Sequence, residues 1–364
     1  MNAPGSRVLA PPPLRTWLQT LVEQGGSDLH LVVGHPPVQR LHGDLVELPA
    51  PVLTSALLYE LLPQLCPPEV ACRLESEKDV DFSCLLSLGE QAVRVRVNVF
   101  FAQREPGLCL RLIPEAIPDF AWAGFPEPVA DRLANLRDGL VLVTGATGSG
   151  KTTTLAMIVN RIHQAGGHRI ITVEEPVEYL FPPAPHSLVT QREVGVDVPS
   201  FADGLKYGLR QDPDVILVGE IRDRPTAQMA LSAAETGHLV FSTLHARDAK
   251  GALTRYADLF PQDVQREVRA VLALSLRAVL SQRLLPSSTP GAKRELALEI
   301  LWNTAPISVA IRNGKVESID NYLLIGRDEG MLSFDESVRL LWRAGRITRE
   351  VAEHNVRELA VLNR

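Results

Sequence analysis

The pattern of apolar and polar positions divides the chain near residue 139. From there to about residue 286, short runs of consecutive apolar residues alternate with stretches of apolar residues at helical spacing. Consecutive apolar residues are typical of strands buried on both faces. Their alternation with helices predicts an α/β fold in which a parallel sheet has helices on both sides. The expected strands are 140–144, 169–173, 214–219 and 239–243, with 187–192 as an irregular addition. An amphipathic helix is expected over 262–284.

The first 113 residues follow a different pattern and predict a separate, smaller domain. Residues 1–13 are rich in Gly, Ala and Pro and are expected to be a flexible tail. The domain that follows, 14–113, is expected to be an α+β unit with an antiparallel sheet. Its expected helices are 14–23, 52–65 and 69–77, and its expected strands are 28–33, 36–40, 43–48, 80–86, 92–101 and 108–113.

Prolines mark the boundary between the two expected domains. Four of them, at positions 114, 118, 126 and 128, predict a linker over 114–138 that can act as a hinge. The core is then expected to span 139–290. One strand, 296–302, leads into a C-terminal region, 291–364, that is expected to be mainly helical.

Composition and charge exclude several classes of protein. Hydrophobic residues make up 45% of the chain and charged residues 22%, as in soluble globular proteins. The net charge of −6 argues against general nucleic-acid binding, and no apolar run approaches the roughly 20 residues that a membrane span needs. The cysteines form no C-x-x-C pair, so a structural zinc site is not expected and a cytoplasmic location is. They are Cys66, Cys72, Cys84 and Cys109.

A glycine-rich loop between the strand 140–144 and the next helix carries the clearest chemical signal. It has the pattern G-x-x-x-x-G-K-T, and its strand–loop–helix context is that of a phosphate-binding loop. Lys151 is expected to reach the β- and γ-phosphates and the Thr152 hydroxyl to hold Mg²⁺. The chain is therefore expected to bind ATP or another nucleoside triphosphate with Mg²⁺. The expected binding residues are Gly145, Ala146, Thr147, Gly148, Ser149, Gly150, Lys151, Thr152 and Thr153.

Carboxylates and histidines follow the other expected strands. Glu174 and Glu175 end one strand and Glu220 ends another, at the edge where a parallel sheet places its ligand site. Glu220 is expected to activate the attacking water, and Glu174 and Glu220 to assist the metal ion. His238 and His245 flank a single strand, about 23 Å apart by strand geometry, so they cannot share one ion. His245, at the carboxyl end, is placed to sense the γ-phosphate.

Several motifs together resemble the secretion ATPase superfamily, most closely the type IV pilus retraction (PilT-like) ATPases. The matching segments are TGATGSGKTTT, EEPVEYLF, QREVG, LRQDPDVILVGEIRD and AAETGHLVFSTLHARDA, with further similarity in GSDLHLVVGHPPVQRLHGDLVEL near the start and DEGMLSFDESVRLL near the end. The resemblance covers about residues 14–350. It implies a RecA-like P-loop ATPase core preceded by a PAS-like domain.

The resemblance also implies roles for individual residues. Gly145–Thr152 corresponds to the Walker A loop, Glu174, Glu175 and Glu178 to the acidic box, and Asp214–Glu220 to the Walker B strand. The two histidines correspond to the histidine box, with His238 as a nucleotide contact. Family members are homohexamers in which arginines reach the nucleotide held by the neighbouring subunit. The residues in matching or candidate positions are Arg96, Arg111, Arg192 and Arg210.

The function implied is a Mg²⁺-dependent hexameric motor that retracts a pilus. It is expected in the cytoplasm, at the inner membrane, pressing on a polytopic platform protein, with a paralogous pilus ATPase as a possible second partner. The chain lacks the additional N-terminal domain and tetracysteine zinc loop of assembly-type relatives, which favours the retraction branch. Three alternatives remain: an ATPase of a type II or type IV secretion system, a weakly hydrolysing regulatory ring, and a RecA-type nucleic-acid motor, which the acidic composition disfavours.

Overall fold

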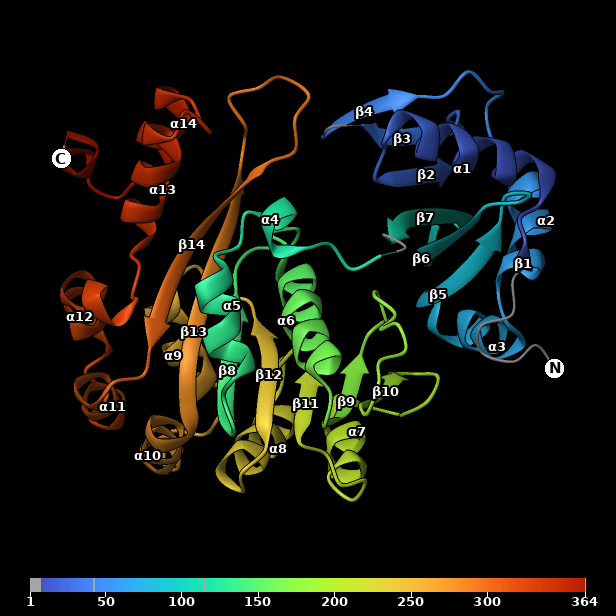
Figure 1. Cartoon of the computed structure of the whole chain (residues 1–364). Helices are drawn as coiled ribbons and strands as arrows, with labels where there is room; N and C mark the ends of the chain where they lie inside the picture. The colour runs from blue at the N-terminus through green and yellow to red at the C-terminus, as the bar shows by residue number, and fades with distance from the viewer. Residues whose placement is uncertain (1–7, 42, 114–115, 364) are drawn as a thin grey trace. The chain divides into compact units, whose positions relative to one another are not determined.

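The computed structural model describes residues 8–41, 43–113 and 116–363 (Figure 1). The chain forms two compact units. The first contains 1–116 together with 176–180, and the second contains 117–175 and 181–364. Among the described residues, each unit is built around one seven-stranded sheet. The first unit therefore includes a short segment that follows the strand ending in Glu174.

The first unit packs helices against a mainly antiparallel sheet with the strand order β1-β5-β6-β7-β2-β3-β4. Its strands are β1 (Val8–Leu9), β2 (Asp28–Val32), β3 (Val38–Leu41), β4 (Asp44–Glu47), β5 (Asp79–Ser87), β6 (Ala92–Ala102) and β7 (Glu105–Ile113). Its helices are α1 (Pro12–Gln24), α2 (Ser55–Leu65) and α3 (Pro68–Glu77). The alternating burial along β6 confirms the strand pattern expected from the sequence.

The prediction of a flexible tail over residues 1–13 is wrong for residues 8–13, which the structure describes. Residues 1–7 lie outside the described residues, but Val8 and Leu9 pair in parallel with Leu86 and Ser87. Helix α1 begins at Pro12, because proline fits the first turn of a helix, where its missing N–H costs no hydrogen bond.

The second unit has the strand order β10-β9-β11-β12-β8-β13-β14, parallel except for β14. The expected α/β fold with a parallel sheet is thus confirmed. The connections β8–β9 and β11–β12 run in opposite directions along the sheet, so right-handed crossovers place α6 and α8 on opposite faces. The strands are β8 (Gly139–Thr144), β9 (Arg169–Glu174), β10 (Leu188–Glu193), β11 (Val215–Val218), β12 (Leu239–Leu244), β13 (Leu276–Leu285) and β14 (Glu295–Trp302). The helices that accompany them are α6 (Lys151–Ala165), α7 (Phe201–Gly208), α8 (Arg224–Glu235), α9 (Ala249–Asp258) and α10 (Gln265–Ser275).

The linker expected over 114–138 contains two helices. Residues 114–115 lie outside the described residues, but α4 (Phe120–Ala123) and α5 (Glu127–Ala134) follow, and α5 lies beside α6 (Figure 1). Ala130 and Leu133 are fully buried in the core of the second unit. Pro126 and Pro128 stand at the N-terminus of α5, where proline is compatible with a helix, so the proline-rich composition did not indicate an unstructured segment.

The long helix expected over 262–284 is also wrong. Helix α10 ends at Ser275, and the chain continues directly as β13 between β8 and β14. Between Leu276 and Leu285 seven of the ten residues are buried, because the strand is covered on both faces. A short apolar run of this kind does not distinguish a buried strand from a buried helix.

The sheet of the second unit continues past residue 290, where the sequence placed the end of the core. Strand β14 pairs with β13 along its whole length and leads to a mainly helical region, as expected. Phe334, Val338, Ile347 and Leu362 of this region pack in one cluster with Leu285 and Ala297. Its elements are α11 (Ala305–Arg312), η1 (Val316–Ser318), α12 (Ile319–Ile325), η2 (Gly326–Glu329), α13 (Phe334–Arg343), α14 (Arg349–Asn355) and η3 (Leu359–Asn363). In the part of the chain that the structure describes, no helix is long and apolar enough to cross a membrane.

Candidate functional site

The glycine loop joins β8 to α6 and has a backbone that requires glycine. Gly145, Gly148 and Gly150 all have positive φ, of 149°, 76° and 88°. A Cβ on Gly145 would lie 2.4 Å from the carbonyl oxygen of Gln282, so the loop is pressed against β13. Helix α6 begins at Lys151 without a side-chain cap, which leaves the N–H groups of its first turn available to an anion.

Lys151 lies over this loop. Its ammonium group is 3.0 Å from the carbonyl oxygens of Gly145 and Ala146, and the side chain is buried. Thr152 and Thr153 follow in the first turn of α6 and are half-buried. The lysine expected to bind phosphate is therefore held within the loop where phosphate is expected to bind.

Gln282 of β13 contacts the glycine loop, and the sequence did not identify it as part of the site. Its amide nitrogen donates to the carbonyl oxygen of Ser149 at 2.9 Å and lies 3.2 Å from the Thr154 hydroxyl. The side chain is buried, because β13 lies next to β8 in the sheet. The sequence placed this residue in a helix, so nothing connected it with the loop.

Removal of this support is expected to weaken nucleotide binding. In Gln282→Ala the Ser149 carbonyl loses its buried donor, a loss of about 1–3 kcal/mol, so we expect the dissociation constant for ADP to rise about tenfold. Titration of a fluorescent ADP analogue measures the change. The matched control is Gln64→Ala on α2, because Gln64 is exposed and bonds to the carbonyl oxygen of Glu60 in its own helix; this change should leave the affinity unchanged. Equal affinity in the two variants would contradict this role for Gln282.

Three neighbouring strands carry the expected acidic and histidine residues to one edge of the sheet. Strands β9, β11 and β12 are parallel and adjacent, and their carboxyl ends lead into Glu174, Glu220 and His245. Glu174 is buried and accepts hydrogen bonds from Thr172 (2.6 Å) and Gln191 (3.2 Å). Glu174 is thus oriented by its own strand and by β10.

Glu220 is held between two partners. One carboxylate oxygen lies 3.1 Å from Nε2 of His245, and the other lies 2.9 Å from Nε of Arg222. Arg222 also reaches Glu175 at 2.9 Å, so one arginine joins the acidic residues of two strands. The role expected for His245, sensing the γ-phosphate, stays a prediction. Arg222 was missed, although its position two residues after Glu220 was a signal.

His238 does not join this group within the chain. It precedes β12, at the end opposite to His245, and its carbonyl oxygen accepts from the N–H of Gly139 at the start of β8. Its Nδ1 lies 3.0 Å from the carbonyl oxygen of Ala233. The structure therefore places His238 at the end of α8, where it caps the helix, and away from the glycine loop of its own chain.

Two arginines of the second unit lie apart from Glu220. Arg192 is on the edge strand β10, one residue before the pair Glu193–Glu174, and bonds to the carbonyl oxygen of Gly204 at 3.3 Å. Helix α7 then runs back toward the amino end of β9, since Gly204 faces Val173 and Gly208 faces Ile171. Arg210 follows α7 and is exposed, at the edge of the sheet opposite to the carboxylates.

The other two arginines belong to the first unit. Arg96 and Arg111 face each other across β6 and β7. Arg111 pairs with the buried Asp28 at 2.6 Å, and Arg96 lies 3.4 Å from Asp81 and 4.0 Å from Glu178 of the acidic box. Both arginines thus stand on one face of the first sheet, in contact with carboxylates of their own unit.

The donor set fits Mg²⁺ bound together with phosphate oxygens. Thr152, Glu174 and Glu220 offer the oxygen ligands that Mg²⁺ prefers, usually as one or two protein groups beside substrate phosphates. Among the described residues, no three His, Cys, Asp or Glu side chains form a metal-binding group.

Comparison with known proteins gives consistent results. The family model described as "Type II/IV secretion system protein" matches residues 72–323. The uncharacterized protein YggR of Escherichia coli K12 is 40% identical over 90% of this chain and 97% of its own length. The type IV pilus retractation ATPase PilT of Pseudomonas aeruginosa is 38% identical over 93% of this chain and 95% of its own. A crystal structure of the pilus retraction motor PilT with bound ADP superposes with a TM-score of 0.83, at 38% identity, covering 96% of this chain and 98% of that chain.

Proposed function

This chain belongs to the type II/IV secretion system protein family and is a nucleotide-binding ATPase, and on that premise we propose that it is a hexameric motor that retracts type IV pili. The similarity to pilus retraction ATPases extends over almost the whole length of both chains, which supports a shared mechanical function. Its place of action is then the cytoplasmic side of the inner membrane, and its partner is the polytopic platform protein at the pilus base.

The observation that carries the proposal is the position of Glu220 between His245 and Arg222. Glu220 lies at the edge of the sheet where β8 ends and the glycine loop begins. In the mechanism we propose, Lys151 and the first turn of α6 bind the phosphates. Glu220 orients the attacking water and accepts its proton, and His245 and Arg222 hold the Glu220 carboxylate in place. Thr152 and Glu174 would hold Mg²⁺, which supplies charge neutralisation at the phosphates when bound.

A ring explains how the expected arginines contribute. In the described part of the chain, no hydrogen bond or ion pair joins Arg192 or Arg210, the two candidates of the second unit, to Glu220. Arg222 already pairs with two carboxylates of its own chain. In a head-to-tail hexamer, Arg96 and Arg111 of one subunit would reach the nucleotide of the next, and such an arginine is worth about 10³–10⁵ in rate.

ATP turnover is expected to require assembly. We expect the specific rate of phosphate release to rise steeply over the protein concentrations at which mass photometry shows hexamers, because each site needs a second subunit. Full turnover by monomers would contradict a shared site.

A mixing experiment tests the shared site directly. Glu220→Gln and Arg96→Ala subunits are each expected to be nearly inactive as homogeneous rings. In mixed rings, an intact Glu220 can stand beside a subunit with an intact Arg96, so activity should reappear. The control is a mixture of Glu220→Gln with Lys151→Ala subunits. One subunit supplies both Glu220 and Lys151 to a given site, so every site in these mixed rings lacks one of the two residues. Recovery equal to that control would contradict Arg96 as the residue that acts across subunits.

The cellular role is tested by deleting the gene and restoring it as wild type or as Glu220→Gln. A retraction motor predicts loss of twitching motility, with surface pili retained, and restoration by the wild type alone. The first alternative, a type II or type IV secretion ATPase, predicts instead a loss of protein or DNA export with normal twitching. A regulatory ring predicts that Glu220→Gln restores function as well as the wild type does.

A further inference from the structure

The loop 245–248, between β12 and α9, connects Glu220 to the end of the chain. It begins with His245, which contacts Glu220, and ends with Asp248, whose carboxylate accepts from Gly251 N–H at 2.7 Å and caps α9. The loop is not packed in the core, since its four residues are half-buried or exposed. It also borders an open pocket of about 640 Å³. Polar contacts therefore fix its position.

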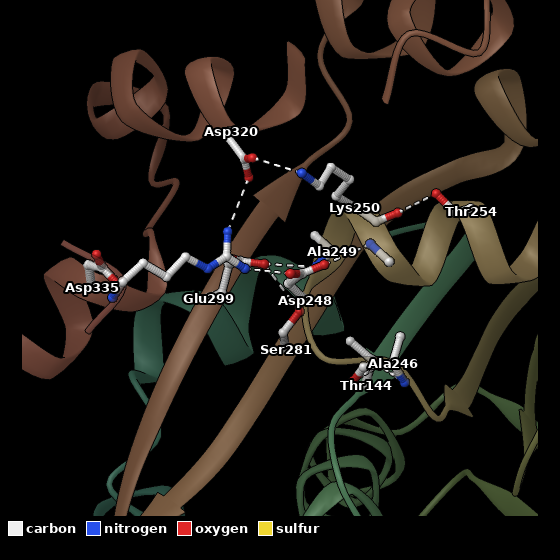
Figure 2. A network of polar contacts seen from close by, with 12 residues as sticks. Thr144, Ala246, Asp248, Ala249, Lys250, Thr254, Ser281, Glu299, Asp320 and Asp335 are labelled. Atoms are coloured by element: carbon white, nitrogen blue, oxygen red, sulfur yellow. Dashed lines mark hydrogen bonds and ion pairs between the residues drawn. The ribbon is translucent and has the colours of Figure 1, made fainter. Parts of the chain in front are cut away.

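Two of these contacts are with strands of the second unit's sheet, one at Ala246 of the loop and one at Ala249, the first residue of α9. The backbone N–H and carbonyl oxygen of Ala246 both bond to the Thr144 hydroxyl, at 2.8 and 2.9 Å, and Thr144 directly precedes the glycine loop. The N–H of Ala249 donates to the buried carboxylate of Glu299 on β14 at 2.7 Å. Burial raises the pKa of Glu299. Figure 2 shows Thr144 beside Ala246 of the loop and Glu299 beside Ala249.

The third contact comes from Arg357, 109 residues further along the chain. Its guanidinium pairs with Asp248 and lies 3.6 Å from Asp320 of α12. Arg357 is itself held in place, because its backbone N–H donates to the carboxylate of Asp335 on α13 at 2.9 Å. Asp320 also binds Lys250 of α9 at 3.1 Å. In Figure 2 the carboxylates of Asp248 and Asp320 lie beside one guanidinium group, and Asp335 lies at the opposite end of the same side chain.

We propose that Arg357 is a positioning residue for ATP hydrolysis: by pairing with Asp248 it fixes the loop 245–248 and so holds His245 against Glu220. The C-terminal helices thereby influence the rate at the catalytic edge without touching nucleotide. This inference rests on the proposed function, since it assigns Glu220 and His245 to hydrolysis.

The geometry gives Arg357 an effect on rate more than on affinity. Asp248 keeps its cap to Gly251 when Arg357 is removed, so α9 remains formed, but its second carboxylate oxygen loses the charged partner that orients it. The side of the loop that carries His245 then becomes less ordered. The glycine loop and Lys151, which bind the phosphates, lie on β8 and α6 and keep their own contacts.

The test is a double-mutant cycle on the full-length chain. Steady-state ATP turnover is measured for wild type, Arg357→Ala, His245→Ala and the double variant, with Arg349→Ala as matched control. Arg349 is exposed and pairs with Glu353 four residues along α14, so its loss should leave turnover unchanged. We expect Arg357→Ala to lower kcat about tenfold with the KM for ATP within twofold of wild type, a size typical of coupled neighbours. Arg357→Lys should recover part of the loss.

The double variant decides between positioning and general stability. If Arg357 acts through the loop, Arg357→Ala lowers turnover in the wild type but adds less than a twofold loss when His245 is already absent. An equal fold loss in both backgrounds, or unchanged kcat in Arg357→Ala, overturns the inference. If Arg357→Ala does not fold, as judged by thermal unfolding, Arg357→Lys takes its place in the same cycle. A wild-type protein without turnover would instead overturn the proposed function.

Discussion

Replacement of Glu220 by glutamine is expected to stop ATP hydrolysis and leave nucleotide binding intact. Glutamine has the size of glutamate and can still bond to His245, but it cannot accept a proton from water. Loss of a general base lowers kcat by about 10²–10⁴-fold. Binding should change little, because the Glu220 side chain contacts His245 and Arg222 and not the glycine loop. Phosphate release and titration of a fluorescent ATP analogue measure the two effects separately.

The control for this variant is Glu235→Gln. Glu235 is an exposed glutamate at the end of α8, at the edge of the sheet away from the phosphate loop, and we expect its turnover to match wild type. A Glu220→Gln protein with kcat within threefold of wild type would show that another group activates water. Glu174, which is buried and oriented by Thr172 and Gln191, would then be the next residue to test.

Replacement of Lys151 by alanine is expected to abolish turnover for a different reason. Its ammonium group lies within the glycine loop, beside the carbonyl oxygens of Gly145 and Ala146, where phosphate oxygens are expected to bind. Removal of one such charged donor from a site that stabilises developing charge costs about 10²–10³ in kcat. Unlike Glu220→Gln, this variant should also bind nucleotide more weakly, because the lysine contacts the phosphates in the ground state.

Lys206→Ala is the matched control, since Lys206 is exposed on α7 and lies against the ring of Tyr207. The conservative variant Lys151→Arg separates charge from shape. Arginine keeps the charge but is planar and longer, so we expect it to restore little activity in a loop that closely surrounds the lysine. Turnover above a tenth of wild type in Lys151→Ala would contradict a direct contact between this residue and the transferred phosphate.

The sequence predicted most elements of the core because each depends on neighbouring residues. The apolar runs that became β8, β9, β11 and β12 are buried on both faces, and consecutive apolar residues indicate this directly. The predictions were wrong for two segments. The run that forms β13 has the same local pattern as a buried helix, and the prolines around 126 have the composition of a linker although they begin α5.

Local patterns in the sequence indicate a phosphate-binding loop, acidic residues after two buried strands, and motifs that resemble those of secretion ATPases. Which side chains meet is visible in the folded chain and not in these patterns. Strand order places Glu220 beside His245 and Gln282 next to the glycine loop. The packing of the C-terminal helices brings Arg357 to Asp248. A local pattern records which residues are buried and how they repeat. Contacts between distant segments depend on the order in which the strands pair, which is a property of the whole chain.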